Sequence, residues 1–194
     1  MRLFTSYADP HLIDCLSDGG VIVMPTDTVY GIVARATDRA AVERLFKLRG
    51  RDRQKPFIVL VADQWQISDK TLWTPEHIRL AKRYWPGPLS LVAPASDKTP
   101  DYLQHPQTHT VAYRVPASLG LHKLLEATGP LVAPSANLAG EPTATTLAEA
   151  ERYFGDSVDG YVDGGTLEGR AASTVASVEN GKVKVLRPGA LRIL

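Results

Sequence analysis

Two kinds of hydrophobic pattern alternate along the chain. Short, wholly apolar runs such as Val21 to Met24 are typical of strands that are buried on both faces. Between such runs lie longer stretches with apolar residues at helical spacing, such as Val42, Leu45 and Phe46. The alternation predicts an α/β fold, with a twisted, largely parallel or mixed open sheet, helices on both faces and a ligand groove at the strand ends.

Capping residues and glycines set the expected ends of several elements. Asp38 is of the residue type that caps a helix at its N-terminus, and Gly19-Gly20 closes the first helix. Residues 25–31, which follow the first strand, are interpreted as a strand-to-helix turn. Helices are predicted at 9–17, 38–46, 75–84, 119–127 and 146–153, and strands at 21–24, 57–61, 89–93, 110–115, 131–133, 160–162, 174–178 and 183–186.

Composition is typical of one soluble globular domain spanning residues 1–194. The chain is 44% hydrophobic and 22% charged, and no linker or internal repeat divides it. It has no apolar run of the roughly 20 residues that a membrane span needs and no signal-peptide pattern, so we expect a cytoplasmic protein without a membrane partner. Its single cysteine, Cys15, excludes an internal disulfide and a thiolate zinc cage.

Several nucleotide and metal motifs are missing from the sequence. There is no G-x-x-x-x-G-K-[ST] loop, no G-x-G-x-x-G turn, no H-E-x-x-H and no C-x-x-C. The five histidines are scattered without ligand spacing, so no protein metal site is expected. Any phosphate would therefore be held by means other than a P-loop or a Rossmann turn.

A basic window covers residues 44–55. It contains six basic residues and one acidic residue in a chain whose formal net charge is +1. A solvated helix end, favoured by the helix dipole, accounts for Lys47 and Arg49. It does not account for Arg51, Arg53 and Lys55, which continue beyond Gly50, where their mutual repulsion favours a bound anion. The window therefore predicts a local polyanion site.

Polar residues also recur where predicted strands end. Thr26, Arg114, Ser135 with Asn137, and Arg187 each come at the end of an apolar run. Ligands of open α/β sheets collect at the carboxyl ends of strands, so these side chains are predicted to meet in one hollow. The alternative, that they make turns, cap helices or lie on the surface, stays open for each residue taken alone.

Seven motifs stand in the order found in one known family. They are Pro25-Thr26-Asp27-Thr28-Val29-Tyr30-Gly31, Arg49-Gly50-Arg51 with Lys55-Pro56-Phe57, Trp85-Pro86-Gly87-Pro88-Leu89-Ser90, Val111-Ala112-Tyr113-Arg114-Val115-Pro116, Pro134-Ser135-Ala136-Asn137, Ala172-Ser173-Thr174-Val175 and Arg187-Pro188-Gly189. In these motifs the chain resembles the YrdC/TsaC-like family of threonylcarbamoyl-AMP synthases, in its single-domain form. The resemblance extends from about Gly19 to Gly189 and implies the fold of that family.

The resemblance implies a nucleotidyltransferase activity. L-threonine, bicarbonate or CO2, and ATP with Mg2+ would be joined into threonylcarbamoyl-AMP with release of pyrophosphate. A downstream threonylcarbamoyl-transferase complex would then modify tRNA. Carbamate and triphosphate are both anions, so fixed cations are the main requirement of this chemistry.

Site residues are likewise implied by the resemblance. The family usually has lysine at the position of Arg49, and arginine keeps the charge but changes the shape. For Tyr30, a place in the core is the alternative to a place in the pocket wall. The implied catalytic and phosphate contacts are Arg49, Arg51 and Lys55; the further ATP contacts are Thr110, Asn137, Thr145 and Arg187; the L-threonine contacts are Thr26, Tyr30, Arg114, Ser135 and Ser173.

A second hypothesis is a non-catalytic RNA-binding or ribosome-associated module with the same fold. The basic window would bind the phosphates of tRNA or double-stranded RNA, extended by Arg79, Lys82 and Arg83. Recognition of RNA by stacking needs exposed aromatic residues, and the window contains only Phe46, which helical spacing assigns to the core. The sequence therefore favours the enzyme.

Overall fold

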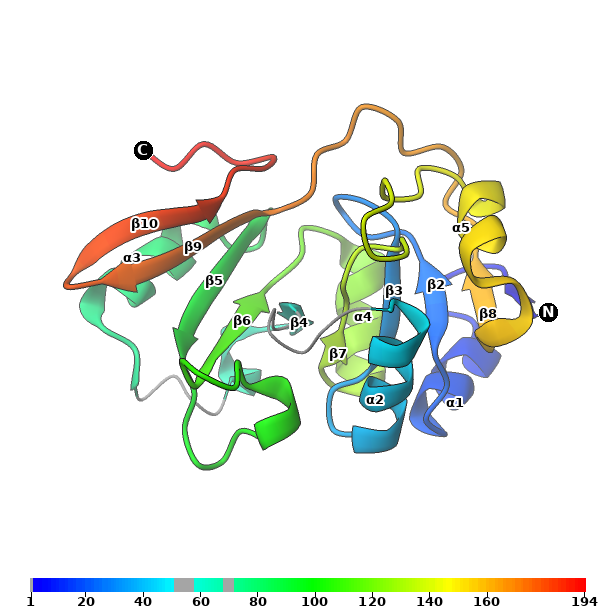
Figure 1. Ribbon diagram of the computed structural model, residues 1–194, viewed down its shortest axis with the longest axis horizontal. Helices are drawn as coiled ribbons and strands as arrows, with labels where there is room; N and C mark the ends of the chain where they lie inside the picture. The colour runs from blue at the N-terminus through cyan, green and yellow to red at the C-terminus, as the bar shows by residue number, and fades with distance from the viewer. Residues whose placement is uncertain (1, 51–57, 68–71) are drawn as a thin grey trace.

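The computed structural model describes residues 2–50, 58–67 and 72–194. Within these ranges the strands form one ten-stranded sheet in the order β1-β8-β2-β3-β7-β4-β6-β5-β9-β10 (Figure 1). The strands are β1 (Leu3–Phe4), β2 (Ile22–Met24), β3 (Gly31–Arg35), β4 (Ile58–Leu60), β5 (Leu89–Pro94), β6 (Thr110–Arg114), β7 (Leu131–Val132), β8 (Gly160–Val162), β9 (Thr174–Glu179) and β10 (Lys182–Arg187).

The α-helices begin at side chains that cap their first turns. Asp38, for example, accepts a hydrogen bond from the Ala41 amide at 3.0 Å, which confirms the predicted N-cap. No helix of the described residues is long and apolar enough to cross a membrane. The helices are α1 (Pro10–Ser17), α2 (Arg39–Leu48), α3 (Pro75–Tyr84), α4 (Leu119–Thr128) and α5 (Leu147–Phe154), with short 3-10 turns η1 (Gln64–Gln66), η3 (Asp101–Leu103) and η4 (Gly155–Ser157).

Strand pairing is mixed, as predicted. β2 pairs antiparallel with β3 and parallel with β8, whereas β5 pairs antiparallel with β6 and parallel with β9. β4 and β6 run parallel, so their carboxyl ends lie at the same edge of the sheet. This edge includes Arg114, the last residue of β6.

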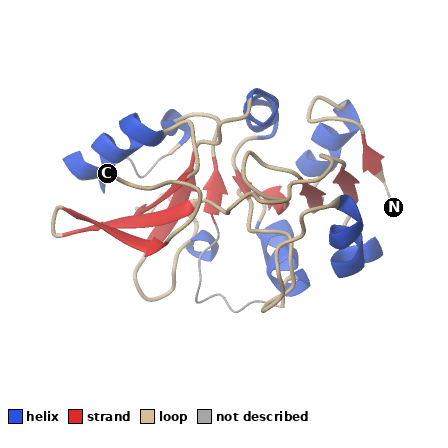
Figure 2. Cartoon of the chain, turned by 90° about the horizontal axis from the view of Figure 1, so that it is seen from above, coloured by secondary structure: helices blue, strands red, loops and turns tan. Residues whose placement is uncertain are grey.

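Helices cover both faces of the sheet, as the sequence predicted (Figure 2). Successive residues of β2 show why, because Val23 is buried in one core cluster and Ile22 in another. The first cluster includes apolar side chains of α2, α3 and α5, and the second includes those of α1 and α4. Burial on both faces explains why β2 is apolar throughout.

Most predicted elements are present with their ends shifted by one or two residues, but two strands were missed. The interpretation of residues 25–31 as a strand-to-helix turn is wrong, because the chain enters β3 and forms an antiparallel hairpin with β2. β3 has little polar contrast, since four of its five residues are buried. β1 is only two residues long, too short for any periodicity to show.

Candidate functional site

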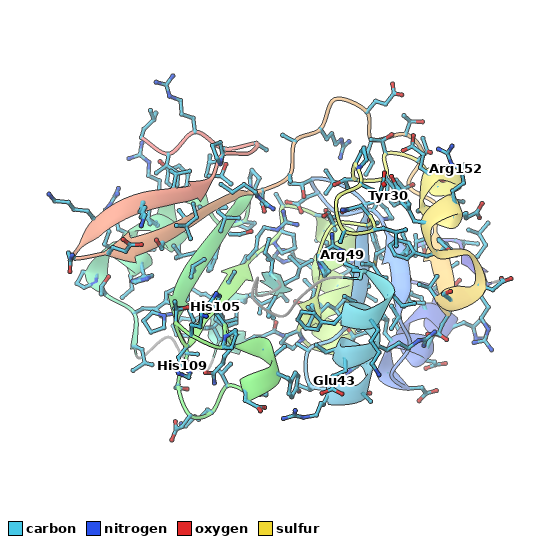
Figure 3. All side chains as sticks on the ribbon, viewed as in Figure 1. Tyr30, Glu43, Arg49, His105, His109 and Arg152 are labelled. Carbon is cyan, nitrogen blue, oxygen red and sulfur yellow. The ribbon has the colours of Figure 1, made fainter. Side chains whose placement is uncertain are left out.

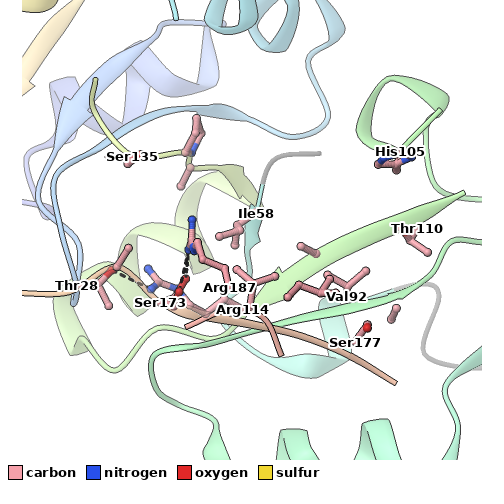
Figure 4. Close-up of a pocket in the computed structure, with 18 of the residues that line it drawn as sticks. Thr28, Ile58, Val92, His105, Thr110, Arg114, Ser135, Ser173, Ser177 and Arg187 are labelled. Atoms are coloured by element: carbon pink, nitrogen blue, oxygen red, sulfur yellow. Dashed lines mark hydrogen bonds between the residues drawn. The ribbon is translucent and has the colours of Figure 1, made fainter. Parts of the chain in front are cut away.

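A cavity of about 670 Å³ opens over one face of β5, β6 and β9 (Figure 4). Alternation along β5 directs Leu89 and Leu91 into the core beside α3, while Val92 lines the cavity. β6 contributes Thr110, Ala112 and Arg114 in the same alternating manner. The cavity therefore lies on the side of these strands that Val92, Ala112 and Arg114 face, and His77 of α3 also belongs to its lining.

Arg114 and Arg187 make one end of the cavity cationic. Arg114 is only 4% exposed, and its Nη1 donates to Thr28 Oγ1 at 2.9 Å, while its Nη2 lies 3.0 Å from Asp27 Oδ1. The partly buried guanidinium of Arg187 donates from Nη2 to the carbonyl of Ser173 at 2.8 Å. Figure 4 shows both arginines at the same end of the cavity. These contacts hold Arg114 beside the Asp27 carboxylate and Arg187 against Ser173.

Burial perturbs both guanidinium groups. It lowers the pKa of Arg114, the nearby charge of Arg187 lowers it further, and the Asp27 carboxylate opposes the change. Burial also lowers the pKa of Arg187. Since both shifts disfavour the charged form, an anion placed between the two groups would relieve an electrostatic cost. This end of the cavity is thus suited to a carboxylate or a phosphate.

Hydroxyl groups surround the cationic end, and each already has a partner. Thr26 Oγ1 donates to the Val29 carbonyl at 2.7 Å and accepts from the amides of Thr28 and Val29, so this side chain shapes the turn between β2 and β3 as well as lining the cavity. Ser173 Oγ lies 2.8 Å from Ser90 Oγ. The turn and the cavity roles of Thr26 therefore coexist.

The other end of the cavity has an apolar floor with a polar rim. Thr110 Oγ1 lies 2.8 Å from Thr108 Oγ1 on this rim, and His105 Nδ1 accepts from the Gln107 and Thr108 amides at 3.2 Å. Such a surface is suited to a flat, weakly polar group. The apolar floor of the cavity consists of Ile58, Val92, Ala112, Val175, Val178 and Leu186, and Val175, which pairs with Arg187, extends it to the cationic end.

The segment 95–109, which connects β5 to β6 and carries His105, packs against the chain between β3 and α2. Tyr102 Oη donates to the Ala36 carbonyl at 3.0 Å, and Arg39 pairs with Asp101 and lies 4.6 Å above the Tyr102 ring. These contacts attach a connection of β5 and β6 to the region between β3 and α2. One wall of the cavity is thereby fixed.

The structure brings most of the predicted site residues together. The predicted residues that line the cavity are Thr26, Tyr30, Thr110, Arg114, Ser135, Ser173 and Arg187. Tyr30 is also fully buried, and its Oη accepts from the Gly164 amide at 2.8 Å and donates to the Gly165 carbonyl at 2.9 Å, so the side chain packs in the core and also lines the cavity, while its contact with threonine remains a prediction.

Other predicted residues lie elsewhere. Arg49 and Asn137 are not among the described residues that line the cavity. Arg49 Nη2 donates a hydrogen bond to Asn137 Oδ1, which also accepts one from Ser135 Oγ. Thr145 donates from its amide and its hydroxyl to Glu149 Oε2 at the start of α5. Arg51 and Lys55 lie outside the described residues, so the role predicted for them remains a prediction.

Sequence reasoning missed Asp27 and Ser90. Asp27 belongs to a quoted motif but was given no role, although a buried arginine needs a carboxylate partner and Asp27 was the acidic residue beside the site. Ser90 of β5 likewise ends the Trp85-Pro86-Gly87-Pro88-Leu89-Ser90 motif but was given no role. Among the described residues, no group of three or more His, Cys, Asp or Glu could hold a metal ion.

The open mixed sheet and its cavity define an α/β protein with a site for an anionic, partly apolar ligand, and comparison identifies the family. The family model Sua5/YciO/YrdC, described as "Telomere recombination", matches residues 14–189. The chain therefore belongs to the Sua5/YciO/YrdC family.

Curated relatives include two proteins named threonylcarbamoyl-AMP synthase. The one from Pyrococcus abyssi (strain GE5 / Orsay) is 37% identical over 178 residues, and the one from Bacillus subtilis (strain 168) is 38% identical over 181 residues. Each alignment covers 91% of this chain but only 52% and 51% of the respective relative. The chain thus spans about half the length of these relatives.

Solved structures show the same fold. Sua5 of P. abyssi complexed with L-threonine matches with a TM-score of 0.88 and 33% identity, over 98% of this chain and 58% of that one. E. coli YciO matches with a TM-score of 0.87 and 26% identity, over 97% of this chain and 96% of that one.

Proposed function

We propose that the protein is an L-threonylcarbamoyladenylate synthase, forming threonylcarbamoyl-AMP and pyrophosphate from L-threonine, bicarbonate and ATP. The observation that carries the proposal is the continuity of the cavity, whose cationic end at Arg114 and Arg187 leads into an apolar end rimmed by Thr110. The names of the relatives and the threonine bound to P. abyssi Sua5 support it.

L-threonine would occupy the cationic end. Arg114 is held by Asp27 and Thr28, so its guanidinium is ready to pair with the α-carboxylate. Ser135 and Ser173 would bind the remaining polar groups of the amino acid. A hydrogen bond to the side-chain hydroxyl would reject valine, whereas a methyl-sized niche separates threonine from serine by only about 1 to 3 kcal/mol.

ATP would extend from the same end toward the apolar floor. Arg187 would contact phosphate oxygens, and the base would lie over Val92 near Thr110. Mg2+ would accompany the triphosphate and neutralise part of its charge. For Arg51 and Lys55, the predicted phosphate contacts rest on the sequence alone.

The reaction brings two anions together. A carbamate oxygen, made from the amine of threonine and CO2 or bicarbonate, attacks the α-phosphorus, and the bond to pyrophosphate breaks. Guanidinium groups fixed in a partly buried site stabilise the charge that develops, and the geometry supplies much of the remaining acceleration. No side chain is required as a general base once the amine has bound in its neutral form.

An assay of pyrophosphate release tests the proposal. The protein is incubated with ATP, Mg2+ and bicarbonate, and threonine is compared with serine and valine. We expect release that depends on bicarbonate and is fastest with threonine. If the rate of pyrophosphate release did not depend on the amino acid, the proposal would be wrong and only nucleotide binding would remain supported.

The RNA-binding alternative gains no support from the described contacts. Arg44 of the basic window donates to Asp159 at 2.6 Å, and Arg79 of the suggested extension is paired with Glu76. In addition, α2 packs near β3 and α3 near β5, with β7, β4 and β6 between these strands (Figure 1). Arg44 of α2 and Arg79 of α3 therefore belong to separate parts of the molecule and do not extend one basic surface. Transfer of the product to tRNA by a downstream complex is part of the proposal and needs no RNA site on this chain.

A further inference from the structure

Arg49 is buried at the end of α2 and faces the loop that follows β7. The residue is 3% exposed and is the C-cap of the helix (Figure 3). Its Nε donates to the main-chain carbonyl of Asn137 at 3.0 Å, and its Nη2 donates to Asn137 Oδ1 at 2.9 Å. The main chain adds a third link, because the Ala139 amide donates to the Arg49 carbonyl at 3.0 Å.

The side-chain amide of Asn137 is fully used by these and neighbouring contacts. Its Oδ1 accepts from Arg49 and from Ser135 Oγ, and its Nδ2 donates to the carbonyls of Leu138 at 2.8 Å and Glu141 at 3.0 Å. An asparagine amide has two donor hydrogens and two acceptor lone pairs, so all four positions are filled. Two carbonyls on the nitrogen side also fix which way the amide points.

Ser135 is where this network reaches the cavity. Its hydroxyl donates to Asn137 Oδ1 at 2.7 Å, which aims the proton away from the cavity and leaves oxygen lone pairs for a ligand. Arg49 Nη2 is also 3.4 Å from Ser135 Oγ, a long contact. The orientation of the serine hydroxyl therefore depends on Asn137, and that of Asn137 depends on Arg49.

We propose that Arg49 is a positioning residue, which acts through Asn137 to fix the Ser135 hydroxyl so that its oxygen lone pairs face the substrate. The inference rests on the proposed function for its kinetic readout. Arg49, the first cation of the Arg49-Gly50-Arg51 motif, then binds the protein's own loop, where the family resemblance had implied a phosphate contact. A lysine cannot reproduce the two parallel bonds, because a single ammonium lacks the planar fork of Nε and Nη2.

A double-mutant cycle tests the coupling. Arg49→Met, Asn137→Ala and the double variant are compared with the unchanged protein in threonine-dependent pyrophosphate release. We expect each single variant to lower kcat on the order of a hundredfold, as small misplacements of reacting groups do. The double variant should be no slower than the worse single one, because both substitutions remove the same support.

The contrary results are equally specific. Independent phosphate contacts would make the losses of the two single variants multiply, and a dispensable Arg49 would leave Arg49→Met near full activity; either outcome overturns the proposal. Lys47→Ala, which removes an exposed cation two residues earlier, is the matched control and should leave kcat unchanged. Thermal melting of each variant separates lost activity from lost folding.

A second measurement needs no variant and no turnover. In protein labelled with 15N-arginine, the Nε–H signal of Arg49 should exchange slowly with solvent, since it is buried and bonded to a carbonyl. We expect it to stay in place when Mg-ATP is added, and a large shift would show that the guanidinium leaves Asn137 for the nucleotide. If the unchanged protein released no pyrophosphate, the proposed function would be wrong. The Nε–H signal would still show whether Arg49 stays bonded to the Asn137 carbonyl.

Discussion

Asp27 and Arg114 form a buried ion pair at the cationic end of the cavity, with 3.0 Å between Oδ1 and Nη2 and side chains only 6% and 5% exposed. The other carboxylate oxygen of Asp27 accepts from the Ala117 amide at 2.9 Å. The pair thus joins the turn after β2 to the end of β6 and sets the position of the guanidinium that we assign to the threonine carboxylate.

Loss of the Asp27 charge should destabilise the fold. Asp27→Asn leaves Arg114 as a buried cation without a counter-charge, which typically costs about 3 to 5 kcal/mol. Urea unfolding measures the change in the free energy of unfolding. Asp97→Asn, at an exposed position, is the control and should stay within about 0.5 kcal/mol of the unchanged protein. Equal effects for the two variants would show that the ion pair contributes nothing.

Arg187→Ala should slow pyrophosphate release on the order of a hundredfold, the usual effect of losing one fixed donor to a developing anion. Lys184→Ala removes a cation from the same strand, one that is exposed and paired with Glu179, and should change little. Steady-state assays of both variants check this. Should the two variants behave alike, Arg187 does not contact the reacting phosphates.

Val92→Trp should fill the apolar end of the cavity and weaken the binding of ATP at least tenfold through steric exclusion, while threonine affinity is retained. Calorimetric titration of each ligand measures the two affinities separately. Val185→Trp places the same side chain at an exposed position of β10 and serves as the control. A variant that lost threonine and ATP to the same extent would contradict separate ends for the two substrates.

His77 should make the protein sensitive to mild acid. Burial lowers the pKa of His77 in the folded state below its ordinary value of 6.5, so the unfolded chain binds the proton more readily. The contribution of the neutral histidine to stability is complete above pH 6.5 and is lost as the pH falls through the folded-state pKa.

In the unchanged protein, His77 Nδ1 accepts a hydrogen bond from the Thr74 amide at the third position of a capping box. His77→Gln removes the titrating group but keeps a residue type that suits this position. Urea unfolding at pH 7.5, 6.5 and 5.5 should show a shallower pH dependence for the variant. Parallel curves for the two proteins would rule out His77 as a source of the acid sensitivity.

Much of the fold could be predicted because its elements have strong local signals. α3 begins at Pro75 and ends at Tyr84 as expected, since a proline, a capping threonine and the Pro86-Gly87-Pro88 turn enclose one amphipathic segment. β3 could not be predicted from alternation, because burial on both faces removes the polar positions. Its place in the hairpin depends on pairing with β2, and the local sequence pattern does not predict which strands pair.

The site was predictable as a set of residues but not in its connections. Thr26, Arg114, Ser135 and Arg187 were expected to converge, and all four line one cavity. The partners of these residues come from tertiary structure. Asp27 becomes the counter-charge of Arg114 only once β2 and β6 lie near each other, and residue type alone gives Arg49 no preference between Asn137 and a phosphate.

The placement of β9 and β10 affects when during synthesis the cavity can exist. Ser173, the residue before β9, and Arg187, the last residue of β10, complete its cationic end, whereas Thr26 lies much earlier in the chain. A chain leaves the ribosome N-terminus first. A nascent chain that has not yet exposed Arg187 would therefore have the central strands of the sheet but would lack one of the two arginines that line the cavity. Capture of a substrate therefore requires that β9 and β10 have been synthesised and have paired with the rest of the sheet.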